Sequence, residues 1–458
     1  TLTTPNISYP LAASYNPRGV NANTGTLAGY DQRKLNSMYE VPKNAATGNN
    51  TLYLSKRPGF DQTDSVSFGV SSQVTYLATL APGQFINDVT ATWVYATSGN
   101  ACQASDATSS TNVILNSATY YPAFADKTSI SGVDTNIVQL VNYSTQDIRT
   151  FYSSSLSAFT EVTSVNFSTL FHTLKMEFMD GYGFVADRST QRIYNSDLNT
   201  RDVWNPLSYI TMQIRQDGLL GLGKIWKGIF SFSEQTAEVY GNAGNEVGSP
   251  LVTIPDLASD VGLYRTPSVN GGVTTLQSGA THYYAIVAGK MFFPGRTALL
   301  DAALYSFDGS RFEQATRGPV NKLIQEAIHS VQLFGVYGIA FAGQEAVALQ
   351  LTHVTTARQR WLMYFPAWQD YFEWTSDKFA PVNSGARFIG VSTTNRHKVA
   401  SIGAASAYTD AGTQYQFLHQ FQIPRDGNTF HKMDMCQLIG DTSQSTSSVS
   451  INVSFSDN

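Results

Sequence analysis

The stretch MEFMDGYGFVADRSTQRIYNSD (176–197) decides the fold class. Met176 and Phe178 alternate with polar neighbours before Asp180-Gly181, and Phe184 resumes the alternation after it. An apolar residue at every second position is typical of a strand with one buried face. Asp-Gly is a strong signal for a tight turn. The stretch therefore predicts short β-strands joined by a turn.

The same pattern continues toward the C-terminus, with a new short strand at intervals of about ten residues. The predicted strands are GYGFVAD, QRIYNSD, KGIFSFSE, TAEVYGN, HYYAIVAG, KMFFPG, AALYSFDG, YGIAFAG, AVALQLT, RWLMYFP and YFEWTSD. The turn residues between them are Asp187, Gly241-Asn242, Gly289, Gly295, Asp308-Gly309 and Gly343. Such repetition indicates a sandwich, a barrel or a propeller, and the repeated aromatic strand after a turn favours the propeller. We predict an all-β protein with a propeller-like β-body.

Three regions differ in composition. Residues 1–60 read as an extended, polar segment that leads into the first strands of the β-body. Residues 61–160 are rich in Ser, Thr and Val and alternate as half-buried strands do. Residues 161–458 contain the repeated strands and form the predicted β-body.

One segment, GPVNKLIQEAIHSVQLFG (318–335), departs from the β pattern. Apolar residues recur at helical spacing, Gly318-Pro319 suits a helix start, and Gly335 suits a helix end. We expect one short amphipathic helix of about three turns. Its apolar face packs either on the β-body or against another subunit.

Composition excludes several classes of protein. Charged residues make up 14% of the 458 residues and hydrophobic residues 42%, which argues against a coiled coil and against a disordered chain. The formal net charge is −5, and the chain contains no block of Lys and Arg. Proteins that bind nucleic acid tightly usually neutralise its phosphates with clustered Lys and Arg side chains. We therefore expect no tight DNA binding, although DNA can still slide past such a surface.

No segment reaches the roughly 18 apolar residues of a membrane-spanning helix. The first residues, TLTTPNISYPL, lack the basic and apolar regions of a signal peptide. We expect neither a membrane segment nor a secretion signal.

The residues that could carry chemistry form no recognised pattern. Cys102 and Cys436 are too few for a disulfide scaffold and are expected to be free, buried thiols. The seven His lack metal-binding spacing, and no GxSxG motif occurs. GLLGLGKIW (218–226) is neither a dinucleotide-binding nor a phosphate-binding loop, and its glycines read as strand-turn residues. We expect no catalytic, cofactor-binding or metal-binding residues, no cofactor, and a protein that is not an enzyme.

Two further motifs have structural readings. Ser196-Asp197 with Trp204, and SFDGSRF (306–312), are incomplete versions of the Asp-boxes of sialidase-type propellers, which stabilise turns. Asp370 and Glu373 form a carboxylate pair, which we interpret as solvated loop residues rather than catalytic groups.

An aromatic run, RQRWLMYFPAWQDYFEWTSD (358–377), allows two interpretations. It could be a carbohydrate-binding platform. Alternatively, the run forms two strands with Pro366 at the turn between them, and the aromatic side chains pack between blades. We favour this second interpretation.

Residues 163–244 carry an ordered series of motifs: Asp180-Gly181-Tyr182, then YNSDL, WNPLSY, DGLLGL and FSEQTAEVYGNAG. The series resembles the tail hub proteins of short-tailed bacteriophages (podoviruses), also called nozzle or packaged-DNA stabilisation proteins. DQRKLNSMYEV (31–41) with LYLSKRPGF (52–60) resembles the opening of that family, and FHKMDMCQLIGD (430–441) resembles its closing strands. Residues 61–160 match poorly, and we interpret them as a β-rich insertion, a nozzle or fibre-contact subdomain.

The resemblance implies a structural virion protein with a propeller-like body. It implies a ring, homohexameric in the family, that closes the portal–adaptor channel, retains the packaged DNA and conducts it during ejection. The implied partners are other copies of the chain, portal and adaptor proteins, tail needle, tailspike or fibre proteins, and genomic double-stranded DNA passing through without sequence-specific binding. The implied location is the phage tail, after synthesis in the bacterial host cytoplasm. We expect Asp and Glu to outnumber Lys and Arg on the lumen wall.

Two other hypotheses remain open at this point. The first is a tail-borne β-propeller that binds or degrades glycans, which would need an open aromatic cleft. The second is another virion β-protein, such as a fibre-attachment or cement protein. Oligomer symmetry separates them: a ring supports the hub, a monomer with a deep pocket the glycan protein, and a trimer the third.

Overall fold

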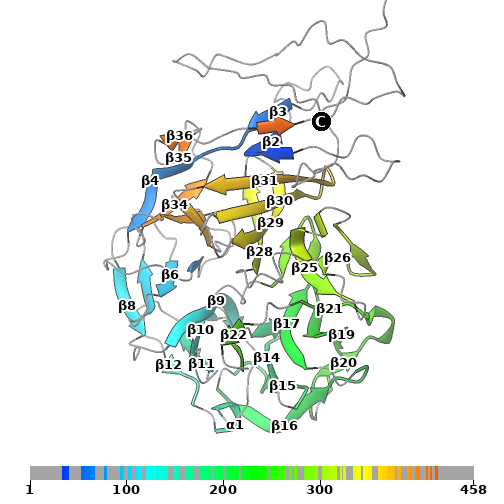
Figure 1. Ribbon diagram of the computed structural model, residues 1–458. Helices are drawn as coiled ribbons and strands as arrows, with labels where there is room; N and C mark the ends of the chain where they lie inside the picture. The colour runs from blue at the N-terminus through cyan, green and yellow to red at the C-terminus, as the bar shows by residue number, and fades with distance from the viewer. Residues whose placement is uncertain are drawn as a thin grey trace, which may run out of the picture.

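The computed structural model is mostly β, with several antiparallel sheets, a short helix, α1 (Val165–Ser168), and a few further helical residues between 320 and 325. This confirms the predicted β class. The structure describes residues 33–40, 53–67, 77–79, 93–96, 102–105, 110–114, 120–130, 133–142, 148–153, most of 160–376, and short segments between 379 and 420. None of the sheets in these parts closes on itself. In Figure 1 the sheets follow one another around the molecule in chain order.

The decisive stretch forms a four-stranded antiparallel sheet of consecutive strands. Its strands are β13 (Glu177–Met179), β14 (Tyr182–Asp187), β15 (Arg192–Ser196) and β16 (Trp204–Thr211). The next sheet repeats the arrangement with β17 (Leu219–Ile225), β18 (Gly228–Ser233), β19 (Ala237–Asn242) and β20 (Leu251–Thr253). Each strand pairs with the one before it, so each sheet is a local meander.

Two larger sheets follow. In the first, β24 (Ala285–Val287), β25 (Lys290–Arg296), β26 (Ala303–Phe307) and β27 (Phe312–Gln314) form a meander to which β21 (Gly262–Leu263) is added. In the second, β28 (Phe334–Phe341), β29 (Gln344–Thr352), β30 (Gln359–Phe365) and β31 (Asp370–Ser376) form another meander. Its edge carries β1 (Arg33–Leu35) and β37 (Leu418–Gln420).

Three further sheets use the strands on either side of this block. The first contains β5 (Leu77–Thr79), β6 (Trp93–Ala96), β7 (Cys102–Ser105) and β8 (Ser110–Ile114). The second contains β9 (Tyr120–Ile130), β10 (Val133–Asn142), β11 (Ile148–Ser153) and β12 (Thr160–Glu161). The third joins β32 (Phe379–Val382), β33 (Ile389–Ser392) and β34 (Lys398–Ile402) to β4 (Phe60–Ser67).

Short hairpins complete the described strands: β2 (Ser37–Glu40) with β3 (Tyr53–Lys56), β22 (Ser268–Asn270) with β23 (Val273–Thr275), and β35 (Thr409–Asp410) with β36 (Thr413–Gln414). A 3-10 turn, η1, spans Pro255–Leu257. Residues 61–160 therefore carry described strands, whereas the domain boundaries at 60/61 and 160/161 stay predictions.

Several predicted turns are confirmed. Asp180 and Gly181 have φ values of 51° and 86° and connect β13 to β14, in the mirror-image turn that suits a two-residue hairpin. Other predicted turn residues were assigned wrongly. Gly241-Asn242 lies in β19, and Gly295 lies in β25. Gly343 lies outside the described residues.

The predicted helix is confirmed where the structure describes it. Residues 320, 321 and 323–325 are helical, and Val320, Leu323 and Ile324 are buried in a core with strands of two sheets. Packing on the β-body is therefore the correct reading for these side chains. The predicted end at Gly335 is wrong, because Gly335 pairs with Gln350 inside strand β28.

The core consists of apolar layers between successive sheets. Phe184 and Ile193 pack with Leu219, Leu222 and Ile229 of the next sheet. The neighbouring Val185 and Tyr194 point to the opposite face and pack with Ile137 of the preceding sheet. Strand residues alternate between faces, so both faces of the β13–β16 sheet are covered. Similar layers join β17–β20 to β24–β27, and β24–β27 to β28–β31.

Candidate interaction surface

The search for a site begins with the side chains that could bind a metal ion. No group of three or more His, Cys, Asp or Glu side chains among them is arranged to hold a metal ion. No helix in the described part of the chain is long and apolar enough to cross a membrane. Cys436 lies outside the described residues, and the side chain of Cys102 is likewise not described.

The carboxylate pair Asp370 and Glu373 does not lie in a solvated loop, so that interpretation is wrong. Both residues are buried in strand β31, with exposed fractions of 9% and 1%. Residues three positions apart in a strand point to opposite faces. The two carboxylates therefore cannot act together on one substrate.

The incomplete Asp-box at Ser196-Asp197 lies at the turn between β15 and β16. The Ser196 hydroxyl accepts a hydrogen bond from the Gly183 amide at 2.9 Å, and the Asp197 amide donates to the Val203 carbonyl at 2.9 Å. Trp204 is buried, with its ring 4.8 Å from the ring of Phe167. These contacts attach the β15–β16 turn to β14 and to α1.

The second motif, at Asp308, forms a turn that contacts the neighbouring sheet. Oδ1 of Asp308 accepts hydrogen bonds from the Ser310 amide (2.9 Å), the Ser310 hydroxyl (2.7 Å) and the Arg311 amide (3.1 Å). These bonds lower the pKa of Asp308 to about 2. Gly309 has a φ of 97°, and the indole of Trp226, from the β17–β18 turn, lies directly against it. The Trp missing from the motif is thus supplied by another sheet.

Two of the three glycines of GLLGLGKIW lie in a strand rather than in a turn. Gly221 and Gly223 belong to β17, and Gly218 precedes it. A Cβ atom at Gly221 would lie 2.5 Å from Oη of Tyr283, and one at Gly223 would lie 3.2 Å from the ring of Tyr284. The ring of Phe232, of β18, would lie closer still to a Cβ atom at Gly223, at 2.8 Å. The two glycines therefore leave space for aromatic side chains, from the same sheet and from the residues that precede β24.

The aromatic run 358–377 is confirmed as core. Pro366 lies in the turn between β30 and β31. The side chains of Trp361, Tyr364, Phe365, Tyr371, Phe372 and Trp374 are all buried. Tyr364 and Tyr371 pack on one face of the sheet, and Trp361 and Trp374 on the other. The carbohydrate-platform reading is therefore wrong for these residues.

The exposed apolar side chains are candidates for contacts with other proteins. The largest exposure on a described edge strand is Leu207, at 74%, in β16. Ser196 pairs with Trp204 and Tyr194 with Tyr209, so the residues between Trp204 and Tyr209 bulge out of the ladder. Leu207 lies at this bulge. Pro206, which cannot donate to a ladder, indicates an edge strand in the sequence.

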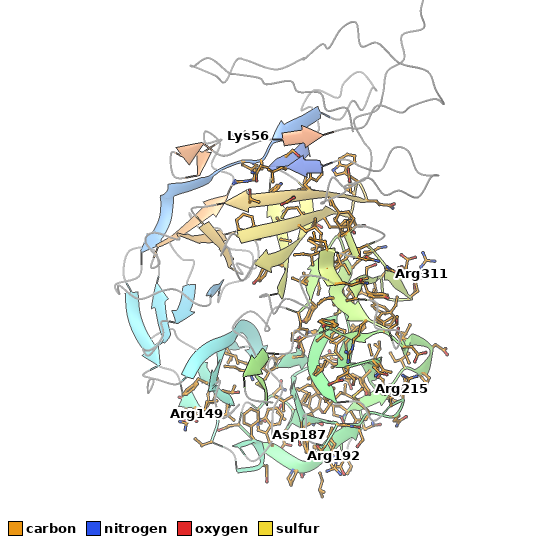
Figure 2. All side chains as sticks on the ribbon, in the orientation of Figure 1. Lys56, Arg149, Asp187, Arg192, Arg215 and Arg311 are labelled. Carbon is orange, nitrogen blue, oxygen red and sulfur yellow. The ribbon has the colours of Figure 1, made fainter. Side chains whose placement is uncertain are left out.

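A second group of exposed apolar residues lies on turns at one end of the first two sheets: Leu198, Val203, Trp226 and Val247. The turns are adjacent, because the side-chain amide of Asn242 donates to Asp180 at 2.8 Å. Trp226 is 63% exposed and is the only aromatic residue in the exposed class among the described side chains. Figure 2 labels Arg311, in the β26–β27 turn, whose Nε lies 3.8 Å from Oδ2 of Asp308.

Comparison of the sequence with known proteins does not assign the chain to a family. No protein-family model matches the chain, and no curated protein matches it significantly.

Proposed function

We propose that the chain is a structural virion protein that forms a homohexameric ring in the tail of a short-tailed phage. The ring closes the portal–adaptor channel, retains the packaged DNA and conducts it during ejection. The ordered motifs over residues 163–244 support this proposal. Portal and adaptor proteins bind on one side, and needle, tailspike or fibre proteins bind on the other or at the rim.

The motifs of the resemblance correspond to defined structural elements. The Asp180-Gly181 turn starts β14, YNSDL ends β15, WNPLSY starts β16 and LLGL starts β17. These elements are two complete, successive meanders with an apolar layer between them. The motifs thus belong to the repeating architecture of the body rather than to a small-molecule site.

We propose further that the body is a propeller with seven blades. The described strands form seven four-stranded antiparallel units: β5–β8, β9–β12, β13–β16, β17–β20, β24–β27, β28–β31, and β32–β34 with β4. In this proposal the first two units, mostly from residues 61–160, are blades of the body and not an insertion outside it. Apolar layers between successive units from β9–β12 to β28–β31 support stacking of blade on blade. Propellers use this radial repetition of four-stranded sheets.

The observation that carries the ring proposal is the bulge on β16. An apolar side chain that is 74% exposed on an outer strand is suited to a permanent contact between subunits. Val252, 47% exposed, adds apolar surface on β20, the outer strand of the next sheet.

The test is the oligomeric state of the purified chain and of its Leu207→Asp variant. Electron-microscopic class averages of the parent protein should have sixfold symmetry. Leu207→Asp should shift the population from ring to monomer, because the contact would bury an unpaired carboxylate.

Thr211→Asp is the matched control, since Thr211 is exposed on the same strand outside the bulge. It should leave the ring intact. A parent protein that stays monomeric with portal and adaptor present would contradict the hub proposal. If the Leu207→Asp variant still forms the ring, the hub proposal stands, but Leu207 is not part of the contact between subunits.

A second candidate function is glycan binding in the phage tail, and Trp226 is the observation that favours it. Its indole is backed by Gly309 and is 63% exposed, an arrangement that leaves one ring face open for stacking. A glycan array with the parent protein and Trp226→Ala tests it. Binding that disappears only in the variant would support this candidate.

A further inference from the structure

Strands from near the N-terminus complete two sheets that are otherwise built from C-terminal strands. β1 pairs in parallel with β31, through Leu35 and Glu373, and in antiparallel with β37. β4 pairs with β34 from Phe60–Ile402 to Ser67–Lys398. We call residues 33–40 and 53–67 the N-terminal strap. In Figure 1, β2 and β3 of the strap lie beside β31, and β4 continues toward β34.

Arg57 is buried where the strap crosses β31, just before β4. Its exposed fraction is 0%. Its Nε donates to Oδ1 of Asn36 at 3.0 Å, and its Nη2 donates to the Thr375 carbonyl at 2.8 Å. Nη1 donates to the Pro58 carbonyl at 2.9 Å. The neighbouring Lys56 is labelled in Figure 2 at this crossing.

Asn36 connects the strap to β31 with both its backbone and its side chain. Its amide donates to the Glu373 carbonyl at 2.7 Å, and Oδ1 also accepts the Thr375 amide at 2.8 Å. Its φ of 51° is a conformation that Asn tolerates better than most residues. We call Asn36, Arg57 and Thr375, with these hydrogen bonds, the Arg57 network.

The network is strongly dependent on docking of the strap. A buried guanidinium is costly unless its N–H groups find hydrogen-bond acceptors. The Thr375 carbonyl can accept from Arg57, and Asn36 can bond to Thr375, only when the strap lies on β31. The hydrogen-bonded residues are 318 and 339 positions apart in the chain. Contacts at such separation form after local hairpins, because loop-closure entropy must be offset first.

We propose that the N-terminal strap is the closing element of the molecule and that the Arg57 network controls its docking. The strap joins last during folding and detaches first during local unfolding. Detachment separates β4 from β34 and β1 from β31, whereas the meanders β13–β20 stay folded. This inference does not depend on the virion role.

The test is hydrogen exchange, followed by mass spectrometry, of the full chain and its Arg57→Met variant. Met keeps an apolar stem of similar length but no donor. Amides in 60–67 and 398–402 should exchange at least about 10-fold faster in the variant, while those in β14 and β18 keep their parental rates. Arg215→Met is the control, since the ion pair of Arg215 with Asp260 (3.7 Å) is solvent-exposed.

Asn36→Gly is the second variant, for the case that Arg57→Met does not fold. Glycine tolerates the positive φ at this position. The substitution removes Oδ1 of Asn36, which accepts hydrogen bonds from both Arg57 and Thr375. It should produce the same regional pattern with a smaller increase. A uniform increase over all sheets would overturn the proposal, because the network would then act on global stability. Unchanged exchange in 60–67 and 398–402 in a folded variant would also overturn it.

Discussion

At the scale of single residues, the indole of Trp226 packs directly against Gly309, so its position requires a residue without a side chain there. Trp226 has a φ of 49°, which is unfavourable for a bulky residue. A Cβ atom at Gly309 would overlap Cζ3 of the indole. Gly309→Ala should therefore combine backbone strain with displacement of the indole, at a cost of about 2–4 kcal/mol in the free energy of unfolding. Urea titration followed by tryptophan fluorescence measures this cost.

Gly244→Ala is the matched control for that substitution. Gly244 has a φ of 68°, but no atom lies within 4 Å of the added methyl group. It should show the strain alone, about 1–2 kcal/mol. Equal losses in the two variants would contradict a specific contact between Gly309 and Trp226.

Asp308 gives a prediction about pH. Hydrogen bonds, first of all from Ser310, lower its pKa to about 2, below the usual value of about 3.9. A folded-state pKa below the unfolded one stabilises the protein above the unfolded pKa, and this contribution disappears as the pH falls toward 2. The difference in unfolding free energy between parent and Asp308→Asn should therefore be present at pH 7 and shrink between pH 4 and 2. A difference independent of pH would contradict this assignment.

At the scale of elements, strands and local hairpins could be predicted, but glycines inside strands could not be distinguished from turn glycines. The Asp180-Gly181 turn was predictable because its φ values require residues of that type. Gly241 and Gly295 misled the prediction because glycines also occur inside strands. A Cβ atom at Gly295 would lie 2.5 Å from Tyr305, a partner that only the folded sheet reveals. The exposure of Leu207 had one sequence signal, the proline beside it.

Glu238 connects β19 to the chain that follows β16. Its buried Oε1 accepts hydrogen bonds from the amides of Gln213 (3.0 Å) and Ile214 (2.7 Å), and Tyr240 donates to Oε2 at 2.7 Å. Glu238→Gln should weaken these bonds and replace one acceptor by a donor, which costs about 1–3 kcal/mol. Thermal unfolding measures the loss.

Glu313→Gln is the control for that loss, because Glu313 pairs with Arg311 at the surface. It should change stability by less than about 1 kcal/mol. If Glu238→Gln is as stable as Glu313→Gln, the buried carboxylate does not hold the two sheets together.

At the scale of the whole molecule, the pairing of N-terminal with C-terminal strands was beyond sequence reasoning. The Asn36–Thr375 contact spans 339 positions, and nothing local to either residue specifies the other. The aromatic run was easier, because a strand–turn–strand reading with Pro366 at the turn already favoured packing of its aromatic side chains.

The charge of the whole chain gives the last prediction, which concerns DNA. The ring proposal requires a conduit that does not hold phosphates, and a chain of net charge −5 without a basic block suits it. Short double-stranded DNA should bind more weakly than about 100 µM at physiological salt, with almost no salt dependence. Each phosphate contact would otherwise add about −0.9 to the slope of log K against log salt. Fluorescence anisotropy measures both quantities, with a basic DNA-binding domain as the positive control. Tight binding with a steep slope would contradict the conduit, because phosphate contacts that stabilise the complex would also resist the sliding of DNA.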